Sequence, residues 1–339
     1  MSIKSKIVRY VFDRGGDVFS KYITGNYPRV LMYHRFSKSE LEDDKVSESK
    51  FVSQMEYLVK NFELITIDDV LKNEKLNRKK PSVCITVDDG YRDFYDVAFP
   101  VLKHYKIPAT FYITTDFVDG KVWFWYDRIR WCIESSSRDR VKDLVENSSF
   151  AYKYGISSED QIWSKMVSSL LRMAPLDVEA RVSELAEILE VTVPELPPYQ
   201  YQSVNWEQVR EMYDSGIVIG AHTLSHYSLG AMSKVEAIDQ IRGSKKRIEQ
   251  ILGRDVTHFC YPNGQLSDIP VDYRSICCEL GLKSSVVAFY DRKGVIDPFA
   301  IRRHGVGSDF YAFKKSVCGI DRLGALLLNK DSKFSWSGV

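Results

Sequence analysis

The sequence of 339 residues has almost no net charge and few cysteines. Lys and Arg together number 47, and Asp and Glu number 46. The basic excess that phosphate backbones require is therefore missing, and nucleic acid is not an expected partner. The six cysteines include no C-x-x-C pair, and Cys277 and Cys278 are adjacent. This pattern argues against a zinc ribbon or a disulfide framework and is typical of reduced, intracellular thiols.

Long apolar runs are also missing. No window of about 18 apolar residues occurs, so no membrane span is predicted. Arg9, Asp13 and Arg14 interrupt the N-terminal residues 1–27, which argues against a secretory signal, and we expect a cytoplasmic protein. Apolar residues at helical spacing predict an amphipathic helix over 3–23. This helix either packs on the domain or makes peripheral contact with the inner face of a membrane.

Short apolar runs alternate with helical patterns over most of the chain. Strands are predicted at 29–33, 82–87, 109–115, 217–221, 257–261, 284–289 and 299–303. Helices are predicted at 49–61, 93–105, 206–215, 234–252 and 272–280. This alternation favours an α/β fold with a parallel sheet. Polar residues collect where strands end, which is the usual position of the site in parallel barrels.

Residues 117–202 interrupt this alternation. The stretch is helical in pattern and holds four of the six tryptophans, Trp123, Trp125, Trp131 and Trp163. We predict a helical insertion in a barrel formed by residues 28–116 and 203–310, followed by a C-terminal extension, 311–339. The insertion's aromatic side chains either form its own small core or line a wall that faces sugar or lipid.

The motif T-V-D-D-G at 86–90 places two carboxylates at the end of an apolar strand. Neighbours in a strand point to opposite faces. Asp88 and Asp89 can face one site only if the chain leaves the strand there, which Gly90 permits. One carboxylate can then hold a metal while the other acts as a base. The alternative is an ordinary helix N-cap.

The motif H-T-L-S-H follows the predicted strand 217–221. On a helical turn, His222 and His226 at positions i and i+4 face the same way and can share one metal ion. Together with Asp89 they form a set of two histidines and one carboxylate. Such a set leaves positions open for water and substrate.

Three further features belong to the candidate site. The Y-P-N-G turn at 261–264 either presents backbone N–H groups to an oxyanion or is an ordinary turn. His34 follows the strand 29–33 and is a candidate to protonate a leaving amine, because histidine changes charge near neutral pH. A capping or core role is the alternative for His34. His304 competes for the role of acid.

In their order, T-V-D-D-G, H-T-L-S-H and Y-P-N-G resemble the motifs of the polysaccharide deacetylases, the NodB-homology group or carbohydrate esterase family four. The resemblance covers roughly residues 28–116 and 203–305. It implies a distorted (β/α) barrel and a divalent metal, usually zinc, on Asp89, His222 and His226. It further implies Asp88 as the catalytic base and the backbone N–H of Tyr91 as the oxyanion donor.

The sequence departs from this family in two places. Cys260 stands where the third motif often carries an arginine that contacts the base, and Arg302 or Arg303 is a candidate substitute. The late Leu-x-x-His-Asp motif that supplies the general acid is not evident. The segment M-Y-H-R is instead similar to permuted members that act on biofilm poly-N-acetylglucosamine, in which the acid histidine comes first. This likeness favours His34 over His304.

The sequence thus predicts a metal-dependent hydrolase that removes an N-acetyl group from an amino sugar in a surface-glycan precursor or other saccharide, nucleotide-linked or lipid-linked. The same constellation serves any acyl carbonyl. A deformylase or O-deacetylase acting on a lipid-linked sugar therefore remains an alternative, as does a non-catalytic sugar-binding protein. The residues expected to contact substrate are Tyr261, Pro262, Asn263 and Arg303.

Overall fold

A computed structural model describes residues 12–25, 28–42, 44–72, 80–289 and 297–320. The strands are β1 (Arg29–Tyr33), β2 (Phe36–Ser37), β3 (Val46–Ser47), β4 (Glu63–Ile65), β5 (Ser82–Val87), β6 (Ala109–Ile113), β7 (Val218–Ala221), β8 (His258–Cys260), β9 (Ser284–Val287), β10 (Ile301–Arg302) and β11 (His304–Gly305). The helices outside the insertion are η1 (Phe12–Gly16), α2 (Asp17–Ile23), α3 (Glu48–Asn61), α4 (Ile67–Leu71), η2 (Phe94–Ala98), α5 (Phe99–Tyr105), α6 (Thr115–Val118), η4 (Tyr199–Tyr201), α12 (Trp206–Asp214), η5 (Leu229–Ala231), α13 (Lys234–Leu252), η6 (Leu266–Asp268), α14 (Tyr273–Glu279) and α15 (Phe310–Cys318).

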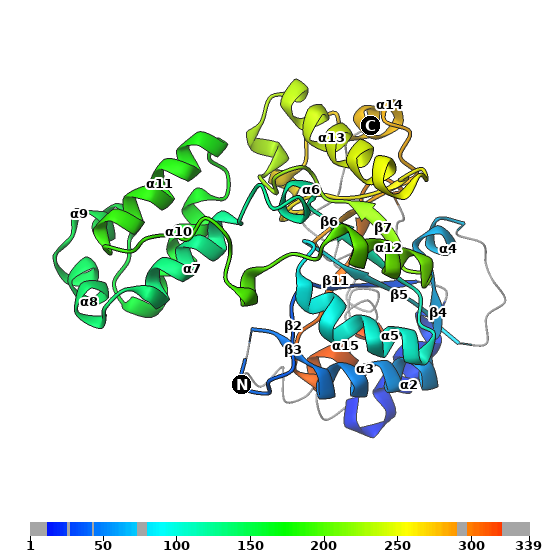
Figure 1. The fold of residues 1–339 in the computed structure, drawn as a ribbon. Coiled ribbons are helices and arrows are strands. Elements are labelled where there is room, and N and C mark those ends of the chain that lie inside the picture. Colours follow the sequence, from blue (N-terminus) through cyan, green and yellow to red (C-terminus); the bar gives the residue numbers. More distant parts are fainter. Residues whose placement is uncertain (1–11, 26–27, 43, 73–79, 290–296, 321–339) are drawn as a thin grey trace.

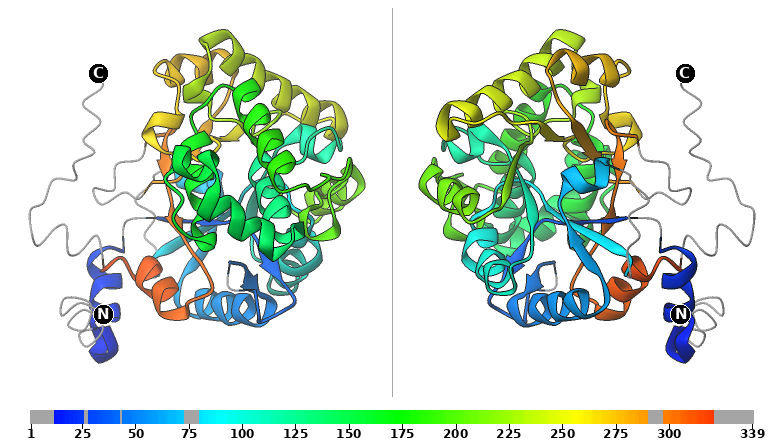
Figure 2. Two further views of the ribbon diagram at one scale, coloured as in Figure 1. Left: turned by 90° about the vertical axis from the view of Figure 1, so that its left-hand side faces the viewer. Right: turned by 90° about the vertical axis from the view of Figure 1, so that its right-hand side faces the viewer.

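Nine of these strands form one parallel sheet that curls into a nearly closed barrel (Figures 1 and 2). Its order is β10-β9-β8-β7-β6-β5-β1-β11, and β4 pairs with the start of β5. Only Arg303 separates β10, which pairs with β9, from β11, which pairs with β1. The segment 301–305 therefore joins the two ends of the sheet, and the predicted (β/α) barrel is confirmed.

The burial of the strands explains why their sequences are apolar on both faces. On β5, Val83, Ile85 and Val87 belong to a large core between the sheet and the surrounding helices. Cys84, on the opposite face, belongs to a second cluster that includes Tyr112 and fills the inside of the barrel. Strands covered on both faces read as continuous apolar runs. The site must therefore lie at an end of the barrel, because its interior is packed.

The helices outside the sheet follow from local sequence signals. On α3, Phe51, Met55 and Leu58 form one buried stripe at helical spacing. Helix α13 begins with a capping box, in which the side chains and backbone N–H groups of Ser233 and Glu236 bond reciprocally, and it ends at Gly253 in the left-handed conformation. Such signals place the helix ends, and with them the loops that carry the site.

The insertion is a group of helices at one end of the barrel. Figure 1 shows these helices projecting to one side, and the left view of Figure 2 places them in front of the barrel. They are α7 (Trp125–Ser135), α8 (Arg138–Asn147), α9 (Ser149–Tyr154), η3 (Glu159–Gln161), α10 (Ile162–Leu170) and α11 (Pro175–Ile188). They share their own apolar core, which includes Trp125, Ile129 and Leu185.

The N-terminal segment is described from Phe12 onward, so Ile7, Val8 and Val11 of the predicted amphipathic helix lie outside the described residues. The continuous helix predicted for 3–23 is wrong within the described part, because Arg14 and Gly15, whose φ is 90°, break the helical conformation inside η1. Helix α2 packs against α15. Its apolar side chains Val18, Phe19, Tyr22 and Ile23 are exposed.

The predicted C-terminal extension, 311–339, is described only as far as Ile320, and within it α15 ends at Cys318. Among the helices that the structure describes, none is both long and apolar enough to cross a membrane.

Candidate active site

The carboxyl ends of the barrel strands surround a pocket of about 240 Å³. Its lining residues are Met32, His34, Asp88, Asp89, Tyr126, Trp163, Val167, Leu171, His222, His226, Tyr261, Asn263, Ala288 and Arg303. Most of the residues that the sequence singled out are therefore brought together. Pro262, His304 and Tyr91 are not among the lining residues.

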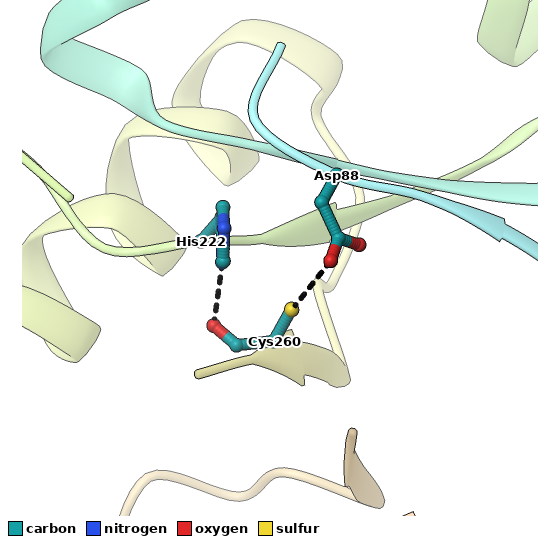
Figure 3. A group of neighbouring side chains, drawn as sticks. All are labelled: Asp88, His222 and Cys260. Atoms are coloured by element: carbon teal, nitrogen blue, oxygen red, sulfur yellow. Dashed lines mark hydrogen bonds between the residues drawn. The ribbon is translucent and has the colours of Figure 1, made fainter. Parts of the chain in front are cut away.

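Three of these side chains converge as metal ligands would. The Asp89 Oδ1 lies 3.3 Å from His222 Nε2 and 3.1 Å from His226 Nε2, and all three residues are buried. The His222 Nδ1 lies 2.7 Å from the carbonyl oxygen of Cys260 (Figure 3). This bond is made by the protonated Nδ1, so the lone pair of Nε2 faces Asp89. Two nitrogens and one oxygen in this arrangement fit a divalent cation.

The charge of Asp89 suits this role. Burial raises the pKa of Asp89, but the neighbouring imidazoles of His222 and His226 outweigh burial and hold the pKa well below its ordinary value. The carboxylate is therefore ionised, as a ligand for a hard or borderline cation must be.

The histidine motif does not form the helical turn that its spacing suggested. His222 directly follows β7, and both Thr223 and His226 have positive φ, 65° and 63°. The Oγ1 of Thr223 accepts a hydrogen bond from His226 N. The side-chain oxygen of Gln240, on α13, accepts hydrogen bonds from the two backbone N–H groups between Thr223 and His226. These side chains hold the strained loop, and the two imidazoles meet because the loop folds back rather than because a helix repeats.

The two adjacent aspartates are also oriented by a left-handed backbone conformation. Asp89 has a φ of 82° and Gly90 a φ of 104°. The reversal thus begins at Asp89 itself, one residue earlier than the glycine suggested. A non-glycine residue in this conformation carries strain of about 1–3 kcal/mol, which is typical of functional positions. As a result Asp88 and Asp89 both face the pocket.

Asp88 is paired with Arg303 inside the barrel. The guanidinium donates to Asp88 Oδ1 at 2.7 Å and to Oδ2 at 2.6 Å, and also to the hydroxyl of Thr86. Burial raises the pKa of Asp88, but Arg303 outweighs burial, and the pKa lies below its ordinary value. The Cys260 Sγ lies 3.4 Å from Asp88 Oδ2 (Figure 3) and 3.2 Å from Arg303.

The choice between Arg302 and Arg303 follows from strand alternation. Arg303, at the junction of β10 and β11, points into the barrel and is only 1% exposed. Arg302 points the other way, and its guanidinium lies 5.3 Å from the ring centre of Phe289. The guanidinium beside Asp88 therefore comes from the junction of β10 and β11, and the small Cys260 stands where the family resemblance leads one to expect an arginine.

The two candidate acids have different environments. The His34 side chain is 45% exposed, lines the pocket and has its Nε2 3.7 Å from Asp88 Oδ2. His304 pairs with Leu31 on the face opposite Arg303 and is buried near Arg29. Burial and the charge of Arg29 lower the pKa of His304 to about 3. His304 is thus neutral and away from the pocket, and the geometry does not support it as the acid.

The Y-P-N-G turn contributes less than the sequence suggested. The Tyr261 hydroxyl points away from the pocket toward Cys277 and the carbonyl of Phe299. The N–H groups of Tyr261 and Gly264 are bonded to carbonyl oxygens of the chain. None of the hydrogen bonds found among the described residues uses the N–H of Asn263 or the N–H of Tyr91. Both N–H groups are candidate oxyanion donors, and the family resemblance favours that of Tyr91.

The insertion supplies pocket residues that sequence reasoning did not assign. Tyr126 of α7 and Trp163, Val167 and Leu171 on or next to α10 form one wall. The abundance of tryptophan in the insertion predicted pocket residues only in part. Trp163 belongs to this wall of the pocket, but Trp125 belongs to the insertion's own core. No sequence signal identified Tyr126, whose ring centre lies 5.7 Å from that of His226.

Comparison with known proteins identifies the class. The model of the polysaccharide deacetylase family matches residues 75–162 and 184–284, more than half of the chain. The chain belongs to this family, as its motifs indicated.

The relatives are similar over part of their length. The chain is 36% identical over 95 residues to the poly-beta-1,6-N-acetyl-D-glucosamine N-deacetylase of Staphylococcus aureus, and the match covers 27% of the chain and 33% of that enzyme. The enzyme of the same name from Staphylococcus epidermidis is 33% identical over 109 residues, covering 27% of the chain and 38% of that enzyme.

Among solved structures, the Streptococcus pyogenes deacetylase PplD in complex with acetate is 17% identical, with a TM-score of 0.53, 85% of this chain covered and 96% of that one. A de-N-acetylase from Aggregatibacter actinomycetemcomitans has a TM-score of 0.53 at 18% identity, with 85% and 99% covered. At these identities the likeness supports the fold alone.

Proposed function

We propose that this protein is a metal-dependent deacetylase that removes the N-acetyl group of an amino sugar. The observation that carries this proposal is the convergence of Asp89, His222 and His226 beside a second, separately held carboxylate. A purely structural metal site uses all its ligand positions for protein groups, whereas three ligands facing a pocket leave room for water and substrate. Asp88 and His34 then stand on the same pocket as base and acid.

The proposed reaction assigns one task to each group. Asp89, His222 and His226 would hold a divalent cation, which we propose to be Zn²⁺, and the cation would supply Lewis-acid polarisation of the amide carbonyl and of water. Asp88 removes a proton from the attacking water, and Arg303 holds that carboxylate ionised and oriented. The Tyr91 N–H donates to the developing oxyanion. His34 as imidazolium protonates the nitrogen as the C–N bond breaks, and acetate and a free amine are the products.

We also propose that the substrate enters as a single sugar of a glycan precursor, nucleotide-linked or lipid-linked. In support, the pocket of about 240 Å³ is smaller than the roughly 300–1,000 Å³ of pockets for drug-sized ligands. The apolar wall from α10 gives one side of it a surface suited to an acyl group or a lipid. The exposed apolar side chains of α2 provide a candidate surface for peripheral membrane contact.

The proposal is tested by incubating the protein with N-acetylated sugar nucleotides, lipid-linked sugars, chitooligosaccharides and poly-N-acetylglucosamine, and by measuring acetate. We expect acetate release that chelation abolishes and added Zn²⁺ restores, and we expect metal analysis to find about one bound cation per chain. Formylated and O-acetylated analogues in the same panel test the deformylase and O-deacetylase alternatives. Sugar binding by the metal-loaded protein without release of any acid would contradict the proposal and support a binding protein.

Replacing His34 by Ala is expected to lower kcat by about 10²–10⁴-fold, the usual effect of losing a general acid. His34 is not a metal ligand, so metal content should not change. Replacing His304 by Ala is the matched control, because His304 lies near Arg29 on the other face of the sheet. The His304 variant should lose some stability but keep kcat. Equal kcat values in the two variants would contradict the assignment of His34.

A further inference from the structure

The start of helix α7 reaches from the insertion to the back of the catalytic pocket. The ring centres of Phe124 and Tyr126 lie 4.9 Å and 5.7 Å from that of His226. Asp127, on the same stretch, accepts a hydrogen bond from the hydroxyl of Tyr91, with 2.5 Å between the oxygens, and the hydroxyl of Tyr126 lies 3.4 Å from the same Tyr91 hydroxyl. A segment outside the barrel thus contacts both a proposed metal ligand and the residue that carries the proposed oxyanion donor.

The Tyr91 side chain is held on every side. Its ring packs edge-on against Phe117 and Phe124. The guanidinium carbon of Arg35 lies 3.7 Å from the ring centre, and Arg35 is itself paired with Asp93 at 2.7 Å. The hydroxyl donates its hydrogen bond to Asp127. The orientation of the Tyr91 peptide therefore depends on where this side chain is anchored.

The backbone around Tyr91 is held in the same way, except at one group. Arg92 N donates to the carbonyl of Gln202, and Val204 N donates to the carbonyl of Gly90. The N–H of Tyr91, between them, has no partner among the hydrogen bonds of the described residues. It is kept in place by its neighbours, and no hydrogen bond among the described residues competes for it.

Asp127 is costly for the fold. It is only 4% exposed, and none of the ion pairs found among the described residues includes it. A buried carboxylate without a cationic partner destabilises a protein unless hydrogen bonds compensate. Burial raises its pKa to about 7, although Arg35 and the bond from Tyr91 act in the opposite direction. An apolar residue would pack here at lower cost, so a buried carboxylate at this position points to a role beyond stabilising the fold.

We propose that Asp127 is a positioning residue, which holds the Tyr91 hydroxyl so that the Tyr91 N–H points at the oxyanion, and that the insertion thereby completes the catalytic site. This inference rests on the proposed function. The bond spans the two units: Tyr91 belongs to the loop after β5, and Asp127 belongs to the insertion. The insertion is then required for turnover as well as for the shape of the pocket.

The test uses the full chain and three variants at this bond. Asp127→Ala removes the acceptor, Tyr91→Phe removes the donor, and Asp127→Asn keeps an oxygen that can accept the bond. We expect kcat to fall by about 10–100-fold in the first two, with KM and metal content nearly unchanged, because a misplaced group costs up to about 10²-fold. The Asn variant should retain most of kcat.

The double variant Tyr91→Phe/Asp127→Ala should be no slower than either single variant, since each already breaks the same bond. Tyr95→Phe is the matched control, because the Tyr95 hydroxyl bonds to Glu211 at the surface, and its kcat should not change. If the Ala variant does not fold, Tyr91→Phe, which loses one oxygen, carries the test with Asp127→Asn.

Unchanged kcat in folded Tyr91→Phe, or additive losses in the double variant, would overturn the positioning role. Failure of the proposed function is distinguishable from this result, because the unmodified protein would then release no acetate from any compound of the panel.

Discussion

Replacing Asp88 by Asn is expected to remove nearly all turnover while the protein still binds its metal. Asn has almost the same shape, but it cannot take a proton from water, and loss of a general base lowers kcat by about 10²–10⁴-fold. The three proposed metal ligands do not include Asp88, so the metal content should stay at the level of the unmodified protein. The measurement is kcat from acetate release together with metal analysis of the same preparation.

Asp96→Asn is a suitable control for the Asp88 variant. Asp96 is a half-buried aspartate that pairs with Arg92 and accepts a bond from Tyr199, away from the pocket. Its replacement should leave kcat unchanged. If the Asp88 variant kept full activity with normal metal content, the water would have to lose its proton elsewhere, and the assignment of the base would be wrong.

Replacing Arg303 by Met is expected to cost both stability and activity. The change leaves Asp88 buried without its cation, and breaking a buried pair in this way destabilises a protein by about 3–5 kcal/mol. Without Arg303, burial raises the pKa of Asp88, and part of the base is then protonated at neutral pH. We expect a large fall in kcat, which should partly recover as the pH is raised. Denaturant unfolding and a pH profile of kcat provide the measurements.

The difference in unfolding free energy between the unmodified protein and the Arg303 variant is expected to depend on pH. The folded-state pKa of Asp88 lies below its ordinary value, so the pair stabilises the protein above about pH 4, the ordinary pKa of Asp. This contribution is lost as the pH falls through the folded-state pKa. The gap in unfolding free energy between the two proteins should therefore be widest near neutral pH and shrink in acid.

Arg302→Met is the matched control for Arg303, because it removes the same charge from the neighbouring position. Its guanidinium lies over Phe289, on the face away from Asp88, and its loss should change stability by no more than about 1 kcal/mol. If the two arginine variants behaved alike, the pair between Arg303 and Asp88 would not be the source of the effect.

Much of the barrel could be predicted from the sequence because its signals are local. The predicted strands 29–33 and 82–87 and the predicted helix 234–252 coincide with β1, β5 and α13. Their apolar runs, capping residues and glycines act within a few positions along the chain. Strands as short as β4, β2 and β3 were not predicted, because two or three residues show no periodicity.

The site was only partly predictable for the opposite reason. Sequence spacing suggested a helical turn for the histidine motif, but the left-handed conformations of Thr223 and His226 depend on contacts with α13. The order of the chain could not show which arginine meets Asp88, since Arg303 reaches it across 215 positions. The contact between Asp127 and Tyr91 has no signature in the chain at all.

The sequence by itself determined the family and the parallel barrel and identified the residues that we propose to carry the chemistry, because acids and histidines at strand ends are local patterns. Only the tertiary structure decided how they are used. Barrel closure at Arg303 sends its guanidinium inward to Asp88 and turns His304 away, and the docking of the insertion places Asp127 on Tyr91. These contacts join residues far apart in the chain, and only packing brings them together.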